Sequence, residues 1–162
     1  MFEIEILTKK GFKNSHGKHV LSDIFELGIK DITKVEYSPL YLIYGDISSA
    51  EAETMASELL SDKIIEDYVV NCHCDLSFEV VNSEVPSLGS SVSIIEVWYK
   101  KGVTDVVAES VVKAVKDLGI DKDVKVKAGH KYYFHGTTSQ TVLNYIATKL
   151  IANTLVQEYK IK

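Results

Sequence analysis

Near the start of the chain, apolar and polar residues alternate. In Phe2–Thr8 the large apolar residues Phe2, Ile4 and Ile6 stand at every second position, a period that predicts a strand with one buried face. Between His16 and Leu27 the apolar residues recur instead at spacings of three and four, which predicts an amphipathic helix. Gly28 follows and is suited to the left-handed conformation that ends many helices.

The apolar runs that follow predict a hairpin. Ile32–Tyr37 and Leu40–Tyr44 have the composition of strands. Ser38 and Pro39 lie between them and predict a turn, because proline lacks the N–H that a central strand needs.

A second helix and a last strand complete this part of the chain. Ser48 or Ser49 is suited to cap a helix whose apolar residues continue to Leu60 at helical spacing. Glu66 begins a further stretch that predicts a strand. The resulting order, β-α-β-β-α-β, is the ferredoxin-like arrangement, in which two helices cover one face of an antiparallel sheet and leave the other face bare.

The same pattern of residues occurs twice along the chain. Gly11, after two lysines, returns as Gly102 after two lysines, and this offset of 91 positions holds without a gap over roughly 65 residues. The second copy predicts the same elements, including a hairpin that joins residues 124–127 to residues 132–134. Further matches at this offset pair Leu27-Gly28-Ile29 with Leu118-Gly119-Ile120, Gly45 with Gly136, Ala56 with Ala147 and Tyr68 with Tyr159.

We therefore predict an α+β chain of two ferredoxin-like repeats, packed as a pseudo-dimer with antiparallel sheets. The first repeat takes residues 1–70 and the second takes residues 92–162. Residues 71–91 contain several serines, a proline and a glycine and predict a linker; a strand extension up to Val80 is the alternative for its start. One copy of about 70 residues would bury little apolar surface alone, which gives the duplication a physical reason.

The bare faces supply the candidate interface residues. Leu7 aligns with Trp98, and both point away from the face that the helices cover. Tyr68 and Tyr159, equivalent residues of the last strands, are expected to edge the same surface. We expect these side chains to be buried where the two copies pack sheet against sheet. A platform on which a base or ring stacks is the alternative for Trp98.

Composition and charge narrow the class of function. The 162 residues carry a net charge of −5 and have a pI of about 5.5, which argues against nucleic acid as a partner. No apolar run approaches the ~18 residues of a membrane span, and the N-terminus shows no secretion signal, so we expect a cytoplasmic protein and no membrane partner. Cys72, His73 and Cys74 resemble half of a metal site, but no matching second pair of ligands exists, and no metal site is predicted.

No catalytic constellation stands out. The sequence contains neither a glycine-rich phosphate loop nor a Gly-x-Ser-x-Gly motif. His130 and His135 flank a predicted strand and face opposite sides of it, so they cannot share a ligand, and we expect each to be an exposed turn residue. We predict no catalytic and no cofactor-binding residue. Physical reasoning alone favours a small interaction or regulatory module.

Several short motifs occur in a fixed order in both copies. In the second copy they are Lys101-Gly102-Val103, Asp105, Leu118-Gly119, Val126, Gly129, Leu150, Ala152-Asn153 and Glu158-Tyr159. In the first copy they are Lys10-Gly11, Gly17, Leu27-Gly28, Leu59-Leu60 and Ile65-Glu66-Asp67-Tyr68. In this order and spacing they resemble the PurS family, the small subunit of phosphoribosylformylglycinamidine (FGAM) synthase in purine biosynthesis.

The resemblance implies a non-catalytic scaffold subunit or N-terminal domain of FGAM synthase, a ligase that uses glutamine and ATP. It would join an ATP-dependent, PurL-type synthetase to a PurQ-type glutaminase. ATP and Mg²⁺ would then bind the synthetase, and no cofactor would bind this chain. The alternative is a ligand-sensing module similar to ACT domains, with an amino acid or nucleotide at the repeat interface. A stand-alone enzyme is a third, less favoured reading.

Overall fold

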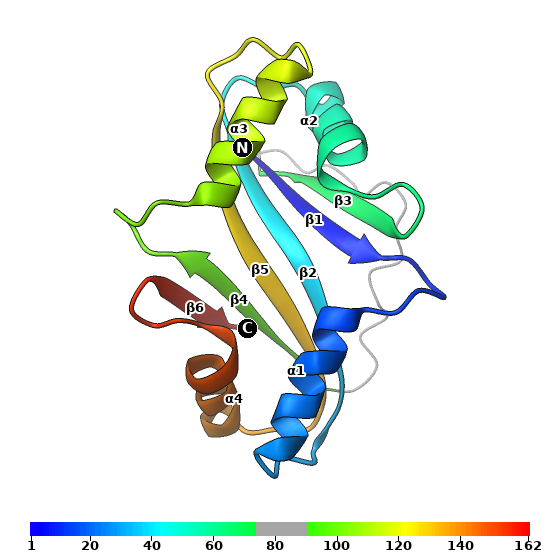
Figure 1. Ribbon diagram of the computed structural model, residues 1–162, viewed down its shortest axis with the longest axis vertical. Helices are drawn as coiled ribbons and strands as arrows, with labels where there is room; N and C mark the ends of the chain where they lie inside the picture. The colour runs from blue at the N-terminus through cyan, green and yellow to red at the C-terminus, as the bar shows by residue number, and fades with distance from the viewer. Residues whose placement is uncertain (74–90) are drawn as a thin grey trace. The chain divides into compact units, whose positions relative to one another are not determined.

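The computed structural model describes residues 1–73 and 91–162 and confirms an α+β chain with an antiparallel sheet (Figure 1). Within these residues the six strands are ordered β3-β1-β2-β5-β4-β6. The elements are β1 (Phe2–Thr8), α1 (Ser15–Glu26), β2 (Ile32–Tyr44), α2 (Ser49–Met55) with the π-helical turn η1 (Ala56–Leu60), β3 (Glu66–Cys72), β4 (Val92–Tyr99), α3 (Val106–Asp117), β5 (Lys125–Gly136), α4 (Gln140–Ile146) with the π-helical turn η2 (Ala147–Ile151), and β6 (Gln157–Ile161).

Neither predicted hairpin forms. β2 continues without a break through Ser38 and Pro39, and β5 continues through residues 128–129. The reason is that both halves of β2 line a hydrophobic core: Val35 is buried in one cluster and Ile43 in another. A turn in the middle of β2 would withdraw one half from its core. Each repeat therefore supplies three strands rather than the four that we predicted.

The compact units of the chain do not coincide with its repeats. Unit 1 contains β1, β3, α2 with η1, and α3, whereas unit 2 contains α1, β4, β6, and α4 with η2. β2 divides between the units after Ser38 and β5 divides after Ala128. Figure 1 shows the result within each unit: α3 of the second repeat lies with the strands of the first, and α1 of the first repeat lies with the strands of the second.

Each unit has its own hydrophobic core. In unit 1 the buried isoleucines of β1 belong to one cluster with Val111 and Val115 of α3. In unit 2 the buried Ile95 and Val97 of β4 belong to one cluster with residues of α1 and α4. Burying an aliphatic side chain contributes about 1.5–3 kcal/mol to the free energy of unfolding. A repeat alone would lose part of this stabilisation, because one of its helices packs in the other unit.

The second helix of each repeat ends in the same way. α2 and α4 pass into η1 and η2, where the backbone N–H groups of Ser61 and Ala152 donate to the carbonyls of Ala56 and Ala147 at 3.0 and 2.8 Å. Isolated π-helical turns of this kind are rare. Their presence at equivalent positions shows that the repeat extends to the detail of the backbone.

The segment between the repeats lies mostly outside the described residues. β3 ends at Cys72, and both the predicted extension up to Val80 and the linker character of residues 74–90 fall outside the described part of the chain. The division into residues 1–70, 71–91 and 92–162 stays a prediction.

Candidate functional site

The four predicted interface residues do not share one face. Tyr68 lies opposite Ile6 in the β1–β3 ladder, and Tyr159 lies opposite Val97 in the β4–β6 ladder. Residues that oppose each other point to the same side of a sheet, so both tyrosines lie on the side of the buried cores, against which they pack. The expectation that they edge the bare face is wrong, and their role in an interface stays a prediction.

Leu7 and Trp98 alternate with these core residues, point to the opposite face and are both half-buried. In unit 2 the indole of Trp98 lies against Gly129, its partner in the β4–β5 ladder. A Cβ at Gly129 would approach three atoms of this ring to 2.5–2.8 Å. With its ring in this position, Trp98 leaves no room for a side chain at residue 129. Neither an interface nor a stacking role for Trp98 is tested by this geometry, and both stay predictions.

Four aromatic rings gather in unit 2 at the start of α1. The ring centroids of His16 and Tyr37 are 4.2 Å apart, and those of Tyr37 and Tyr132 are 5.3 Å apart. His130 completes the group, with its ring centroid 5.4 Å from that of Tyr37. We call these four residues the His–Tyr cluster.

Two hydrogen bonds order the His–Tyr cluster. The hydroxyl of Tyr132 lies 3.1 Å from Nε2 of His16, and the hydroxyl of Tyr37 lies 2.9 Å from Nδ1 of His130. Each imidazole nitrogen donates or accepts according to its tautomer, so each ring can match its tyrosine. Tyr132 is only 4% exposed, and its bond to His16 satisfies a hydroxyl that is nearly out of reach of water.

Burial favours the neutral forms within this cluster. It lowers the pKa of His16 below its ordinary value of 6.5, and repulsion from His19 lowers it further. Burial also raises the pKa of the Tyr132 phenol, and Tyr37 adds to that increase. The hydrogen-bonded His16–Tyr132 pair is therefore uncharged at neutral pH and acts as a packing element.

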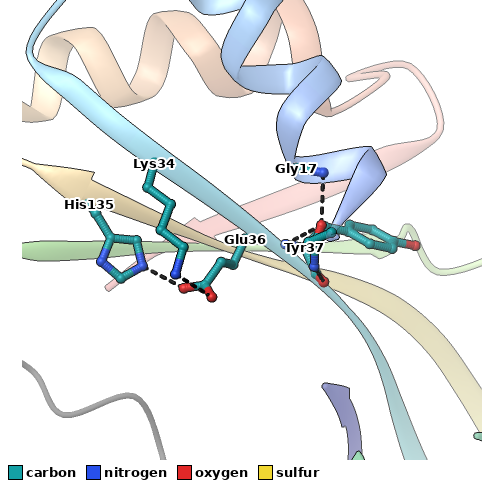
Figure 2. Close-up of polar contacts among 6 residues, drawn as sticks. Gly17, Lys34, Glu36, Tyr37 and His135 are labelled. Atoms are coloured by element: carbon teal, nitrogen blue, oxygen red, sulfur yellow. Dashed lines mark hydrogen bonds and ion pairs between the residues drawn. The ribbon is translucent and has the colours of Figure 1, made fainter. Parts of the chain in front are cut away.

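Asn14 joins the start of α1 to β2. Its side chain caps the helix by accepting from the N–H of Gly17 at 2.9 Å. It also accepts from the N–H of Tyr37 at 3.3 Å and donates to the carbonyl of Tyr37 at 2.7 Å; Figure 2 shows the Gly17 and Tyr37 ends of this joint. A Cβ at Gly17 would lie 2.3 Å from the carbonyl oxygen of Val35, so the helix start approaches the strand as closely as a glycine permits.

A second polar group in unit 2 surrounds Glu36 (Figure 2). Its carboxylate accepts from Nζ of Lys34 at 2.7 Å and from Nε2 of His135 at 2.6 Å. Burial by itself would raise the pKa of Glu36, but the hydrogen bonds from Lys34 and His135 lower it below its ordinary value. Both carboxylate oxygens are bonded, which keeps the group ionised and fixed.

The two histidines of β5 differ from expectation in one respect. His130 and His135 are half-buried strand residues and not exposed turn residues, because β5 runs through the predicted turn. They do bond to different groups, Tyr37 and Glu36, which are neighbours in β2. The sequence contained no signal for these partners, since they come from the other repeat.

Unit 1 contains a different polar pair. Glu51, in the first turn of α2, accepts from Nζ of Lys122 at 2.7 Å and from the backbone N–H of Ser48 at 2.8 Å. The hydrogen bonds from Lys122 and then from Ser48 lower the pKa of Glu51 to about 2. Because Lys122 belongs to the second repeat and Glu51 to the first, this pair links the two repeats within one unit.

Two carboxylates are buried at equivalent positions of the two repeats. Glu5 in β1 and Glu96 in β4 are 5% and 6% exposed. Nζ of Lys162 lies 2.5 Å from Oε1 of Glu96 and pairs with it in unit 2. The recurrence of glutamate at the same place in both repeats was the available signal.

Among residues 1–73 and 91–162, no group of three or more histidine, cysteine, aspartate or glutamate side chains is placed to hold a metal ion; Cys74 lies outside this range. In the same part of the chain, no helix has the length and apolar character needed to cross a membrane.

A family model matches both repeats. The PurS model, described as phosphoribosylformylglycinamidine (FGAM) synthase, matches residues 1–73 and 92–162. Comparison with curated proteins gave no match. The matched ranges follow the two repeats and cover most of the chain, and this family connects the chain to FGAM synthase and to purine biosynthesis. The chain belongs to the PurS family.

Proposed function

We propose that this chain is a non-catalytic structural component of FGAM synthase that joins a PurL-type synthetase to a PurQ-type glutaminase. The observation that carries the proposal is the match of both repeats to the PurS family. The assembly converts formylglycinamide ribonucleotide, glutamine and ATP to the amidine. ATP and Mg²⁺ would bind the synthetase in this proposal.

The pairing of charged side chains supports a structural role. The carboxylates of Glu36, Glu51 and Glu96 each bond to a lysine or histidine of the same unit. A catalytic carboxylate must reach a substrate, whereas these groups are already engaged in holding strands and helix ends in place.

The exchange of helices supports the fusion of two copies in one chain. Each unit needs a helix from the other repeat, so neither core is complete without both repeats. A covalent link keeps the two copies at a high effective concentration. This arrangement supports the proposal that the chain is a stable platform for two partner subunits.

Reconstitution tests the proposal. A PurL-type synthetase and a PurQ-type glutaminase from the same cell are mixed with and without this chain, and glutamine-dependent formation of the amidine is measured. We expect the chain to raise this rate and to bring both subunits into one peak on size exclusion. Synthesis driven by added ammonia serves as the control, because it does not need the glutaminase.

Two results would contradict the proposal. One is a glutamine-dependent rate that is the same with and without the chain, together with no shared peak. The other is a clear rise in the melting temperature of the isolated chain with an amino acid or nucleotide, which would favour the ligand-sensing alternative.

A further inference from the structure

Two equivalent turns each expose one large aliphatic residue. Ile64 precedes β3 in unit 1 and is 74% exposed, and Leu155 precedes β6 in unit 2 and is 84% exposed. A single exposed aliphatic residue needs no explanation, because most surfaces contain some. A pair at the same position of both repeats is less ordinary.

Leu27 and Leu118 are a second equivalent pair, but they are only 39% and 37% exposed, and the more exposed apolar residues are not shared in this way. Val106 and Tyr145 are exposed in the second repeat, but their equivalents in the first are Ser15 and Thr54. Phe25 is exposed in the first repeat, and Lys116 stands in its place in the second.

The turn that carries Ile64 has a defined framework. The N–H of Ile64 donates to Oδ1 of Asp62 at 2.8 Å, and the N–H of Asp62 donates to Oε2 of Glu66 at 2.8 Å. Nζ of Lys9, at the end of β1, donates to the carbonyl of Lys63 at 2.6 Å. These bonds hold the backbone on both sides of Ile64, so the direction in which its Cα–Cβ bond points is fixed.

The turn that carries Leu155 has the same framework with neutral residues. The N–H of Leu155 donates to Oδ1 of Asn153 at 3.2 Å, and the N–H of Asn153 donates to Oε1 of Gln157 at 2.9 Å. Nζ of Lys100 donates to the carbonyl of Thr154 at 2.6 Å. Amide oxygens thus build this turn as well as carboxylate oxygens build the other.

The charge of the first turn is therefore not needed for its shape. Asp62 and Glu66 have no ion-pair partner within the described residues, whereas the nearby Lys63 pairs with Glu58. The turn therefore exposes the aliphatic side chain of Ile64 between Asp62 and Glu66 in the sequence. Neither of these two carboxylates pairs with a lysine or histidine of the described residues. Such a surface is complementary to an apolar pocket whose rim carries lysine or arginine.

We propose that the turn around Ile64 docks into an apolar pocket with a basic rim on a subunit of FGAM synthase. Ile64 fills the pocket, and Asp62 and Glu66 face the rim. The Leu155 turn, which lacks the carboxylates, does not fit this pocket. This inference rests on the proposed function, because it takes its partner from the same assembly.

The test measures the affinity of the full chain for the isolated PurL-type synthetase and for the PurQ-type glutaminase by biolayer interferometry. We expect Ile64→Ser to weaken binding to one of them by about tenfold or more, as removal of a buried anchor does. Asp62→Asn combined with Glu66→Gln keeps the framework of the Leu155 turn. It should weaken the same binding and reduce its change between about 50 and about 300 mM salt.

Matched controls come from the chain itself. Leu155→Ser removes an equally exposed tip in the other repeat, and Val106→Ser removes an exposed apolar residue elsewhere; both should leave this affinity within about twofold. Circular dichroism and urea unfolding establish that each variant is folded. Unchanged affinity of Ile64→Ser for both subunits, or an equal loss with Leu155→Ser, overturns the inference while the proposed function stands. Failure of the wild-type chain to bind either subunit overturns both.

Discussion

Units 1 and 2 have equivalent cores and different polar groups. The buried Ile4 and Ile6 of β1 correspond to the buried Ile95 and Val97 of β4. The residues of the His–Tyr cluster in unit 2, by contrast, correspond to residues that build no such cluster. The corresponding residues are Val107 for His16, Ala128 for Tyr37, Pro39 for His130 and Tyr41 for Tyr132. The apolar pattern is thus what both units need in order to fold, and the cluster is an addition to one of them.

The units also differ in how closely a helix approaches its strand. Gly17 in α1 corresponds to Ala108 in α3, and both residues are buried. A methyl group at position 17 would overlap the backbone of β2, whereas position 108 holds one. The closer approach in unit 2 brings His16 into reach of Tyr132.

Gly17→Ala should have the largest effect. The new Cβ would lie 2.3 Å from the carbonyl oxygen of Val35, so the helix start must move, and we expect the free energy of unfolding to fall by about 2–3 kcal/mol. Urea unfolding followed by the fluorescence of Trp98, the one tryptophan of the sequence, measures this loss.

Ala108→Gly is the matched control for this substitution. It removes a methyl group and lowers helix propensity, so we expect the free energy of unfolding to fall by about 1 kcal/mol, without any overlap of atoms. Equal losses in the two variants would show that α1 and α3 are seated alike and would remove this difference between the units.

The joint between helix and strand is the feature that the units share. Asn14 bonds to the N–H and carbonyl of Tyr37, and Asp105 accepts from the N–H groups of Ala108 and Ala128, each at 2.9 Å. Exchanging the two caps is a sharp test of both joints. Asn14→Asp replaces the donor to the Tyr37 carbonyl by an acceptor, and Asp105→Asn can place an NH₂ group against the N–H of Ala128.

We expect each exchange to lower the free energy of unfolding by about 1–2 kcal/mol, because each leaves a backbone group of a central strand without its partner. The measurement is urea unfolding at one pH. A loss in only one of the variants would mean that the two joints are not equivalent.

Local patterns predicted the repeat, the helices and the core positions of the first strands, because these depend on periods of two and three to four residues. The long strands were missed. Ser38 and Pro39 predict a turn, although His130 stands at the position equivalent to Pro39 in the second repeat and carries no such signal. Whether a turn forms there depends on two separate cores, one for each half of β2, and no local window contains that information.

The candidate site was less predictable for the same reason. His16 and Tyr132 are 116 positions apart, and Glu51 and Lys122 are 71 positions apart. Each pair joins residues of different repeats, because the repeats exchange helices. No local sequence pattern predicts this exchange. The family resemblance, in contrast, depends on the order of short motifs and was confirmed over both repeats.

Tyr132→Phe should have an intermediate effect. It removes the hydroxyl that bonds to His16 in a buried place, and we expect a loss of about 1 kcal/mol in the free energy of unfolding. Tyr41→Phe is the equivalent change in unit 1. Tyr41 is half-buried and its hydroxyl has no hydrogen bond within the described residues, so this change should lower the free energy of unfolding by less than about 0.5 kcal/mol. Equal losses would contradict a special role for the cluster.

The smallest expected effect is a change in the pH dependence of stability. The pKa of His16 is lowered below 6.5 in the folded chain, so the unfolded chain binds a proton more readily at this site. The contribution of neutral His16 to the free energy of unfolding is therefore complete above pH 6.5. It is lost as the pH falls through the pKa that His16 has in the folded chain. Unit 1 has Val107 at this position, and the pKa of its Glu51, about 2, places that group's response at acidic pH.

His16→Val copies unit 1 into unit 2 and tests this difference. Wild-type chain and variant are unfolded with urea at pH 8 and at about pH 5.5, and the two midpoints are compared. The wild-type midpoint should fall more between these pH values than that of the variant, because only the wild type must keep His16 neutral in the folded state. His19→Val is the control: His19 supplies the lesser part of the shift, so this variant should keep most of the wild-type response. Parallel responses of the wild type and His16→Val would show that the cluster does not couple protonation to folding, and the two units would then differ in packing alone.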